Sequence, residues 1–370
     1  MKILVLSAYH APSHRRWVEG LVQRLSHHDF QVLTQPPRHF PWRSRGNSLT
    51  WAFDGDIQQA DPDVIIATSM VDLAGLRGMV PHLAQIPTLV YFHENQFAYP
   101  TRDDRINSNL LVTNLYTALA ADRVLFNSGY NRSSFLSKAE SFLDLMPDQV
   151  PDGVIDEVRH NSAVLPVPLE DELFSAFDND SSAHDGEPLR IVWNHRWEYD
   201  KAPQRFFKAL FSLQSDFDFR LVVLGQQFRE APPIFDEARR RLDDRIDQWG
   251  WVDDRDEYLR WLSDSDIVVS TAIHDFQGLA VQEAAVCGCL PVLPERVAYP
   301  NFFDHAHLYP SHRDDPEADA ASLADHLAEL LVDPHQTRAL EGPDLSHLRW
   351  STMVDRYDGE LCELTAHTGA

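Results

Sequence analysis

Arg196 and Lys201 are five residues apart in the second half of the chain, and together they have the chemistry needed to hold a diphosphate. Arginine binds phosphate through a planar fork and lysine through a compact point charge. A helix expected to begin directly afterwards, at Pro203, would add the positive end of its dipole. The chain has only four lysines, so a lysine here is notable. The alternative is a solvated turn with an ion pair to Glu198 or Asp200.

Asp275 and Glu283 form a second pair of candidates, eight residues apart across an expected strand-to-helix turn. Glu283 could accept both hydroxyls of a ribose, and Gly278 lets a backbone approach a ligand closely. Acidic residues near a helix N-terminus are also common caps, which is the structural alternative. Together with Arg196 and Lys201, the pair indicates a nucleotide-diphosphate pocket. Further donor-site candidates are Asn194, Phe276 and Leu279.

A third group of polar side chains follows the apolar run Thr88–Phe92 in the first half of the chain. It consists of His93, Glu94, Asn95 and Gln96. His93 could hold a sugar hydroxyl or stabilise developing positive charge, or it could be a structural histidine at a strand end. A metal site built from His10, His14, His93 and Glu94 is a further alternative, although the usual ligand spacing is absent.

The segment Pro37–Gly46 (PRHFPWRSRG) interleaves arginines with aromatic residues. Its cations are Arg38, Arg43 and Arg45, and its rings are Phe40 and Trp42. Positive charge for phosphates and flat rings for unstacked bases suit a single-stranded RNA loop. The alternative is an ordinary loop over the first-domain sheet with its tryptophan in the core.

Charge is distributed unevenly along the 370 residues. The chain has 32 basic and 57 acidic side chains, a formal net charge of −25, which argues against a general nucleic-acid-binding module. Residues 1–50, however, carry seven basic and two acidic side chains, and the rest of the chain therefore carries −30. This asymmetry restricts any nucleic-acid contact to a local one.

Short apolar runs alternate with helical patterns, which predicts an α/β fold with parallel sheets. The expected strands are Lys2–Ser7, Asp63–Ala67, Thr88–Phe92, Arg123–Asn127, Leu189–Asn194, Phe219–Leu224, Asp266–Ser270 and Leu290–Leu293. The irregular segments Asn161–Glu170 and Asp178–Pro188 read as an inter-domain linker. We therefore expect two Rossmann-like domains that face a central cleft. Residues 1–168 would form the acceptor-side domain and residues 169–345 the nucleotide-sugar-binding domain. Residues 346–370 are expected to form a helix that packs back toward the first domain.

The remaining composition points to a cytoplasmic protein. Three cysteines form neither a disulfide framework nor a CxxC metal site, and no apolar run is long enough to span a bilayer.

Four aromatic residues of the second half are interpreted as packing residues rather than base-stacking ones: Trp197, Tyr199, Trp249 and Trp251.

These motifs carry a family resemblance. Arg196-x4-Lys201 and Asp275-x7-Glu283 are similar to motifs of the retaining GT-B glycosyltransferases of family 4, with Asp at the first acid position where that family has Glu. The first half resembles the tRNA-queuosine α-mannosyltransferase family more specifically. The resemblance extends over about residues 1–305 and rests on Ser7–Trp17, Tyr91–Pro100, Phe126–Asn131 and Tyr299-Pro300.

The resemblance implies a GT-B fold and retaining transfer of mannose from GDP-mannose to queuosine in the anticodon loop of tRNA(Asp). It implies catalytic roles for His93, Arg196, Lys201, Asp275 and Glu283. It places the donor against Ser13, His14, Asn194, Arg196, Lys201, Phe276, Gly278, Leu279 and Glu283, although Pro12 stands where related enzymes have paired glycines. The acceptor would contact Glu94, Asn95, Gln96, Arg38, Arg43 and Arg45. No metal or other cofactor and no membrane is expected, and the protein is expected to be a monomer.

Two other functions are compatible with the sequence. One is a GT-B glycosyltransferase with a small-molecule or glycan acceptor, which the acid-rich composition favours. The other is a non-catalytic nucleotide-sugar-binding protein, which Asp275 in place of Glu keeps open.

Overall fold

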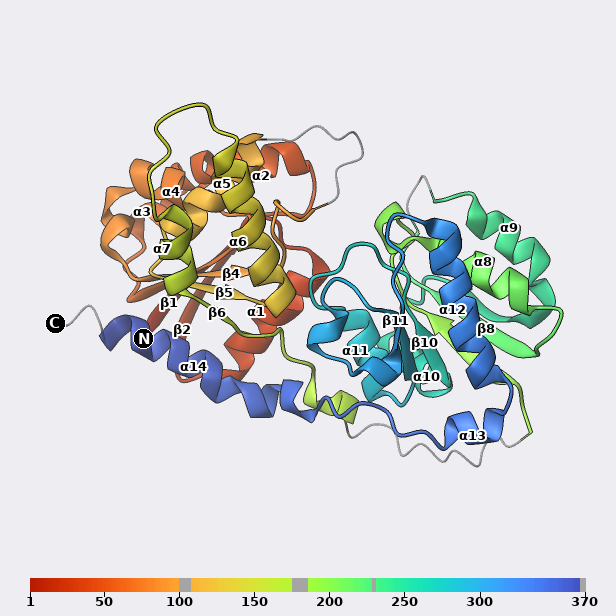
Figure 1. The fold of residues 1–370 in the computed structure, drawn as a ribbon. Coiled ribbons are helices and arrows are strands. Elements are labelled where there is room, and N and C mark those ends of the chain that lie inside the picture. Colours follow the sequence, from red (N-terminus) through yellow and green to blue (C-terminus); the bar gives the residue numbers. More distant parts are fainter. Residues whose placement is uncertain (100–107, 175–185, 228–230, 367–370) are drawn as a thin grey trace. The chain divides into compact units, whose positions relative to one another are not determined.

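The computed structural model describes residues 1–99, 108–174, 186–227 and 231–366. The chain divides into two units (Figure 1). Unit 1 consists of Met1–Pro168 together with Trp350–Ala370, and unit 2 of Leu169–Arg349. Among the described residues, no helix combines the length and the apolarity that crossing a bilayer requires.

Unit 1 contains a six-stranded parallel sheet in the order β2-β1-β3-β4-β5-β6. Its strands are β1 (Lys2–Ser7), β2 (Asp29–Thr34), β3 (Val64–Thr68), β4 (Thr88–Phe92), β5 (Arg123–Phe126) and β6 (Ser162–Val164). Its helices are α1 (Pro12–Arg24), α2 (Phe40–Ala52), α3 (Gly55–Gln59), α4 (Leu73–Met79), α5 (Ser108–Leu119), α6 (Gly129–Asp144), α7 (Val154–His160) and α14 (Trp350–Ala366). Strands β3 and β4 are buried at every residue, as apolar runs in a parallel sheet covered on both faces must be.

Helix α14 packs against α1, β3 and β4 (Figure 1). Its buried residues recur every three or four positions, as one face of a helix requires: Trp350, Met353, Tyr357, Leu361 and Leu364. The last helix of the described chain therefore completes the core of the first unit.

Unit 2 contains a second six-stranded parallel sheet, in the order β12-β11-β10-β7-β8-β9. Its strands are β7 (Leu189–Trp193), β8 (Phe219–Leu224), β9 (Ile246–Gly250), β10 (Ile267–Val269), β11 (Leu290–Pro294) and β12 (Leu308–Tyr309). Its helices are α8 (Pro203–Leu213), α9 (Ile234–Arg241), α10 (Arg255–Ser263), α11 (Leu279–Val286), α12 (Pro316–Leu331) and α13 (Pro334–Arg338).

The order of unit 2 is that of a classical Rossmann sheet, and the chain reverses direction across the sheet between β7 and β10. Ligands of such sheets bind outside the carboxyl ends of the strands at this switch point. The loops after β7 and β10 are therefore the expected binding loops of unit 2.

The structure departs from the sequence-based expectations in several places. Asn161–Glu170 is not all linker, since β6 pairs with β5 there. Asp29–Thr34 is an edge strand that sequence reasoning missed, because most of its side chains are exposed and it lacks an apolar run. Residues Phe40–Gly46 of the arginine-rich segment are helical rather than a loop. The second linker segment, Asp178–Pro188, lies mostly outside the described residues.

Candidate functional site

The loops after β7 and β10 are joined directly by hydrogen bonds. The hydroxyl of Thr271 donates to the carbonyl of Lys201 at 2.8 Å, and the amide of Ile273 donates to the carbonyl of Asp200 at 2.9 Å. The two motifs that the sequence singled out therefore meet at the switch point.

Lys201 is 9% exposed, and its ammonium lies between the two loops. Its Nζ donates to the carbonyl of His274 at 2.8 Å and to Oδ2 of Asp275 at 3.1 Å, and lies 3.6 Å from Oδ2 of Asp200. Burial would raise the pKa of Asp275, but the charge and hydrogen bond of Lys201 act together with the nearby His195 and His274 and lower that pKa to about 2. Asp275 is therefore ionised at neutral pH.

The carboxylate of Asp275 also shapes the turn that leads into α11. Its Oδ1 accepts from the amide of Gly278 at 2.8 Å, and its Oδ2 lies 3.4 Å from the Tyr299 hydroxyl. Gly278 has a φ of +83°, and a Cβ there would lie 2.8 Å from the Tyr299 ring. Glycine is required at this position for both reasons. Asp275 thus orients Lys201 and the start of α11 together.

Glu283 projects from α11 and is held by α10. Its Oε2 accepts from Nη1 of Arg255 at 3.1 Å and from the Tyr258 hydroxyl at 3.4 Å. Asn194, at the end of β7, donates to the same Tyr258 hydroxyl at 3.2 Å and to the carbonyl of Ala280 at 2.7 Å. The Oδ1 of Asn194 is buried and has no hydrogen-bond partner among the described residues. Sequence reasoning missed Arg255 and Tyr258 because they reach Glu283 from a helix that carries no motif.

His195 is a further buried residue that sequence reasoning did not single out. Its Nε2 lies 2.9 Å from the Ser270 hydroxyl, which is 2.6 Å from that of Tyr299. Burial and the nearby Lys201 charge lower the pKa of His195 to about 3, so the ring is neutral at pH 7. Its carbonyl lies so close to Gly225 (φ +119°) that a Cβ there would be 1.9 Å from it. The loops after β7, β8 and β10 are therefore packed tightly together.

Arg196 differs from Lys201 in its surroundings. Its side chain is 48% exposed and forms an ion pair with Glu198 at 2.8 Å. The structural alternative, a solvated turn with local ion pairs, therefore describes Arg196. It does not describe Lys201, because the lysine side chain is buried.

The two remaining donor-site candidates of unit 2 flank Gly278 in sequence. Phe276 is buried against the ring of His274, and Leu279 is half-buried at the start of α11.

A hollow of about 370 Å³ lies beyond the ends of β8 and β9. It is lined by Gln226, Gln227, Trp249, Gly250 and Trp251.

Four aromatic residues of unit 2 are interpreted from the sequence as packing residues. This interpretation holds for Trp197 and Trp249, which stack or pack on Phe235 in the core. It was wrong for Trp251 and Tyr199, which are 59% and 58% exposed.

In unit 1, His93 and His14 form a buried stack at the end of β4. Their ring centroids are 4.2 Å apart, and His14 Nε2 lies 3.2 Å from a Glu94 oxygen. Burial and the neighbouring histidines lower the pKa of His93 well below its usual value. Within the described part of the chain, His93 Nε2 and His14 Nδ1 are buried without a hydrogen-bond partner.

The other residues of this block and the first turn of α1 differ in their availability. Asn95 is fully buried, and its amide group bonds to Asn131, Ser134 and Ala98, so it holds the turn. Gln96 is half-buried, with its Nε2 3.5 Å from the Met70 sulfur. Ser13 is exposed in the first turn of α1, directly after Pro12.

The arginine-rich segment presents two of its three cations to solvent. Arg38 and Arg45 are exposed, and Arg45 lies 3.4 Å from Thr113 of α5. Arg43 is half-buried and donates to Gln35 at 3.1 Å. Trp42 is 55% exposed, so the alternative that placed it in the core was wrong.

The metal alternative of His10, His14, His93 and Glu94 receives no support. In the described part of the chain, the group whose ligand atoms lie within 4.8 Å of one another is His27, His28 and Asp358, elsewhere in unit 1.

Two Rossmann-like units, with a buried lysine at the switch point of the second, define a protein of the GT-B fold class. The fold is similar to that of Anabaena HepE in complex with UDP and glucose (TM-score 0.68, 14% identity, covering 98% of this chain and 100% of that one). It is also similar to sucrose-phosphate synthase of Thermosynechococcus elongatus (TM-score 0.67, 14% identity, covering 99% and 100%). These similarities confirm the expected fold class.

The sequence identifies the family. Residues 2–169 match the family described as tRNA-queuosine alpha-mannosyltransferase N-terminal, and residues 189–333 match glycosyl transferases group 1. The chain is 33% identical over 318 residues to the tRNA-queuosine alpha-mannosyltransferase of Drosophila melanogaster, covering 83% of each. The chain therefore belongs to the tRNA-queuosine alpha-mannosyltransferase family and is a hexosyltransferase, which confirms the resemblance.

Proposed function

We propose that this enzyme transfers mannose, with retention, from GDP-mannose to queuosine in the anticodon loop of tRNA(Asp), acting as a cytoplasmic monomer. The family supports mannose transfer to queuosine of a tRNA, because the Drosophila relative is named tRNA-queuosine alpha-mannosyltransferase. The observation that carries the proposal is the buried Lys201 ammonium bonded to Asp275 at the switch point.

The donor half of the proposal uses unit 2. Lys201 and Arg196 take the two phosphates, with Lys201 fixed by Asp275 and the half-exposed Arg196 exchanging its ion pair with Glu198 for the phosphate. Glu283 takes the ribose hydroxyls while Arg255 orients its carboxylate. The hollow beside Trp251 suits the flat base of the nucleotide.

The reaction breaks the bond between the mannose C1 and the diphosphate oxygen and forms a bond from C1 to a queuosine hydroxyl oxygen. The acceptor proton moves to an oxygen of the departing GDP, so the enzyme needs no covalent nucleophile. Negative charge grows on the diphosphate as it leaves. Lys201 stabilises that charge more in the transition state than in the ground state, which is what accelerates the reaction.

The acceptor half uses unit 1. The unpartnered His93 Nε2 and His14 Nδ1 are suited to hydroxyl groups, and Glu94 and Gln96 flank them in sequence. Arg38 and Arg45 offer positive charge to the phosphates of the RNA loop.

The test is incubation of the enzyme with GDP-mannose and queuosine-containing tRNA, followed by mass spectrometry of the nucleosides. We expect a gain of one hexose on queuosine, none on tRNA with guanine at that position, and unchanged activity in EDTA. Hydrolysis of the donor without transfer would contradict the acceptor, and transfer only from another nucleotide sugar would contradict the donor.

Lys201→Ala tests the phosphate assignment within the same assay. Loss of one group that stabilises developing charge should lower kcat by about 10²–10³-fold. Lys208→Ala is the matched control, because Lys208 lies on α8 at the surface, paired with Glu317. Circular dichroism checks that both variants are folded, and equal kinetics for the two would contradict the assignment.

A further inference from the structure

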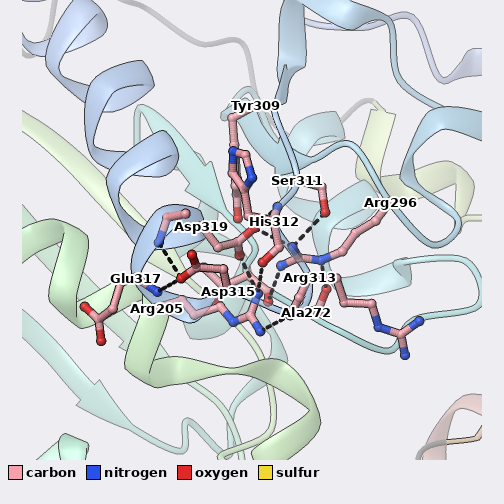
Figure 2. A network of polar contacts seen from close by, with 12 residues as sticks. Arg205, Ala272, Arg296, Tyr309, Ser311, His312, Arg313, Asp315, Glu317 and Asp319 are labelled. Carbon is pink, nitrogen blue, oxygen red and sulfur yellow. Dashed lines mark hydrogen bonds and ion pairs between the residues drawn. The ribbon is translucent and has the colours of Figure 1, made fainter.

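Asp319 of α12 lies at the centre of a buried network of charges in unit 2 (Figure 2). Its side chain is fully buried and accepts from Nη1 of Arg296 at 2.7 Å, from Nη1 of Arg205 at 2.9 Å and from the amide of His312 at 2.8 Å. Burial would raise the pKa of Asp319, but its bonds to the two arginines lower it. One carboxylate thus holds two buried guanidinium groups.

Arg296 links this network to the loop after β10. Its Nε donates to the carbonyl of Ala272 and its Nη2 to the carbonyl of Thr271, both at 2.8 Å. Thr271 in turn bonds to the Lys201 carbonyl, and Asp275 follows a few residues later. Arg296 therefore holds the backbone from which Asp275 projects.

Arg205 links the network to the other loop. It lies in the first turn of α8, and its amide donates to the carbonyl of Ala202, the residue after Lys201. Its guanidinium also donates to the carbonyl of Arg313 at 2.5 Å. The end of the Arg196–Lys201 loop is therefore held by the same carboxylate as the loop after β10.

We propose that Asp319 is a positioning residue that fixes the two loops relative to each other, so that Lys201 is held where the diphosphate of the donor binds. The inference rests on the proposed function of Lys201. Asp319 itself touches neither Lys201 nor Asp275 in the contacts that define the network, and it acts through Arg205 and Arg296. Its charge matters because without it two buried cations would repel each other.

The experiment compares Asp319→Asn with Asp266→Asn in the full-length enzyme. Asp266 is the matched control because it also bonds to an arginine, Arg338 at 2.7 Å, but at the amino end of β10. We expect both variants to have a lower melting temperature. Only Asp319→Asn should lower kcat/KM, by about 10²-fold through kcat as well as KM, since a displacement of the order of 1 Å is enough for such a loss.

Amide hydrogen exchange without ligand separates failure of this inference from failure of the proposed function. Asp319→Asn should speed exchange in residues 196–202 and 270–278 even if the wild type proves to bind no GDP. Unchanged exchange there, or an equal loss of kcat/KM in Asp266→Asn, would overturn the positioning role. If Asp319→Asn does not fold, Arg296→Lys gives the same test. Lysine keeps the positive charge but cannot donate hydrogen bonds to Thr271, Ala272 and Asp319 at the same time. Wild-type kcat/KM in that variant would also overturn the role.

Discussion

His195 and Lys201 are buried bases that lie on one loop but have different electrostatic surroundings. Lys201 has the carboxylate of Asp275 at 3.1 Å, which compensates its burial. Burial and the positive charge of Lys201 lower the pKa of His195 to about 3, and its Nε2 lies beside the Ser270 hydroxyl. Because His195 stays neutral, it adds no second positive charge that would disturb the Lys201–Asp275 pair.

The low pKa of His195 predicts how stability depends on pH. The unfolded chain binds this proton below about pH 6.5 but the folded chain only below about pH 3, so stability is lost as pH falls through that window, by up to about 1.4 kcal/mol per pH unit. Asp275 stays ionised above pH 4 because its pKa is about 2. Urea unfolding at pH 7, 6, 5 and 4 should therefore show a steeper loss for the wild type than for His195→Gln.

The control for this measurement is His305→Gln. His305 lies in the same unit with its side chain 89% exposed, so replacing it should leave the slope with pH unchanged. Parallel pH profiles for the wild type and His195→Gln would contradict the assignment of His195.

Helix α2 is the element that offers unit 1 a basic surface. Arg38 precedes it and Arg45 lies within it, and both are exposed, whereas Arg43 is engaged with Gln35. Trp42 lies on the same helix with more than half of its surface in solvent. A combination of two exposed cations and one exposed ring fits an RNA loop.

The double variant Arg38→Gln/Arg45→Gln should weaken tRNA binding at low salt. If each arginine neutralises one phosphate, the slope of log K against log salt concentration should become shallower by about 2. Filter binding at several salt concentrations measures this. Arg239→Gln/Arg240→Gln on α9 removes the same charge from an exposed surface of unit 2 and should change the slope less. Equal effects of the two double variants would show that net charge, and not α2, accounts for binding.

The sequence was informative wherever local pattern and tertiary environment agree. Strands such as Lys2–Ser7 and Phe219–Leu224 were predicted to the residue because they are buried apolar runs, and the motifs at the switch point were found because they follow such strands. The helical start at Phe40 was missed because α2 has no apolar stripe. The bond between Lys201 and Asp275 was missed because it joins loops 74 residues apart.

At the scale of the whole molecule, unit 1 is assembled from both ends of the described chain. Trp17 of α1 donates to the hydroxyl of Tyr357 on α14 at 3.1 Å, and that hydroxyl lies 2.9 Å from the carbonyl of Pro166. Tyr91 of β4 stacks on Trp17, with their ring centroids 4.3 Å apart. A residue of the C-terminal helix thus joins three other segments of the unit.

Tyr357→Ala should therefore destabilise unit 1 by about 3–5 kcal/mol, the usual cost of truncating a buried aromatic residue. Urea unfolding combined with hydrogen exchange in β3 and β4 measures this. Tyr116→Ala is the control, because Tyr116 is 55% exposed on α5. A change in stability no larger than that of the control would show that unit 1 does not depend on α14.

The position of α14 also affects the order in which the protein can mature during synthesis. The ribosome makes the strands of unit 1 first, but the helix that covers β3 and β4 emerges only after all of Leu169–Arg349. Unit 2, being continuous in sequence, can complete its core while that face of the first sheet is still bare. The nascent chain therefore carries an exposed apolar surface for the time needed to translate almost two hundred residues, and this surface is where a chaperone would bind.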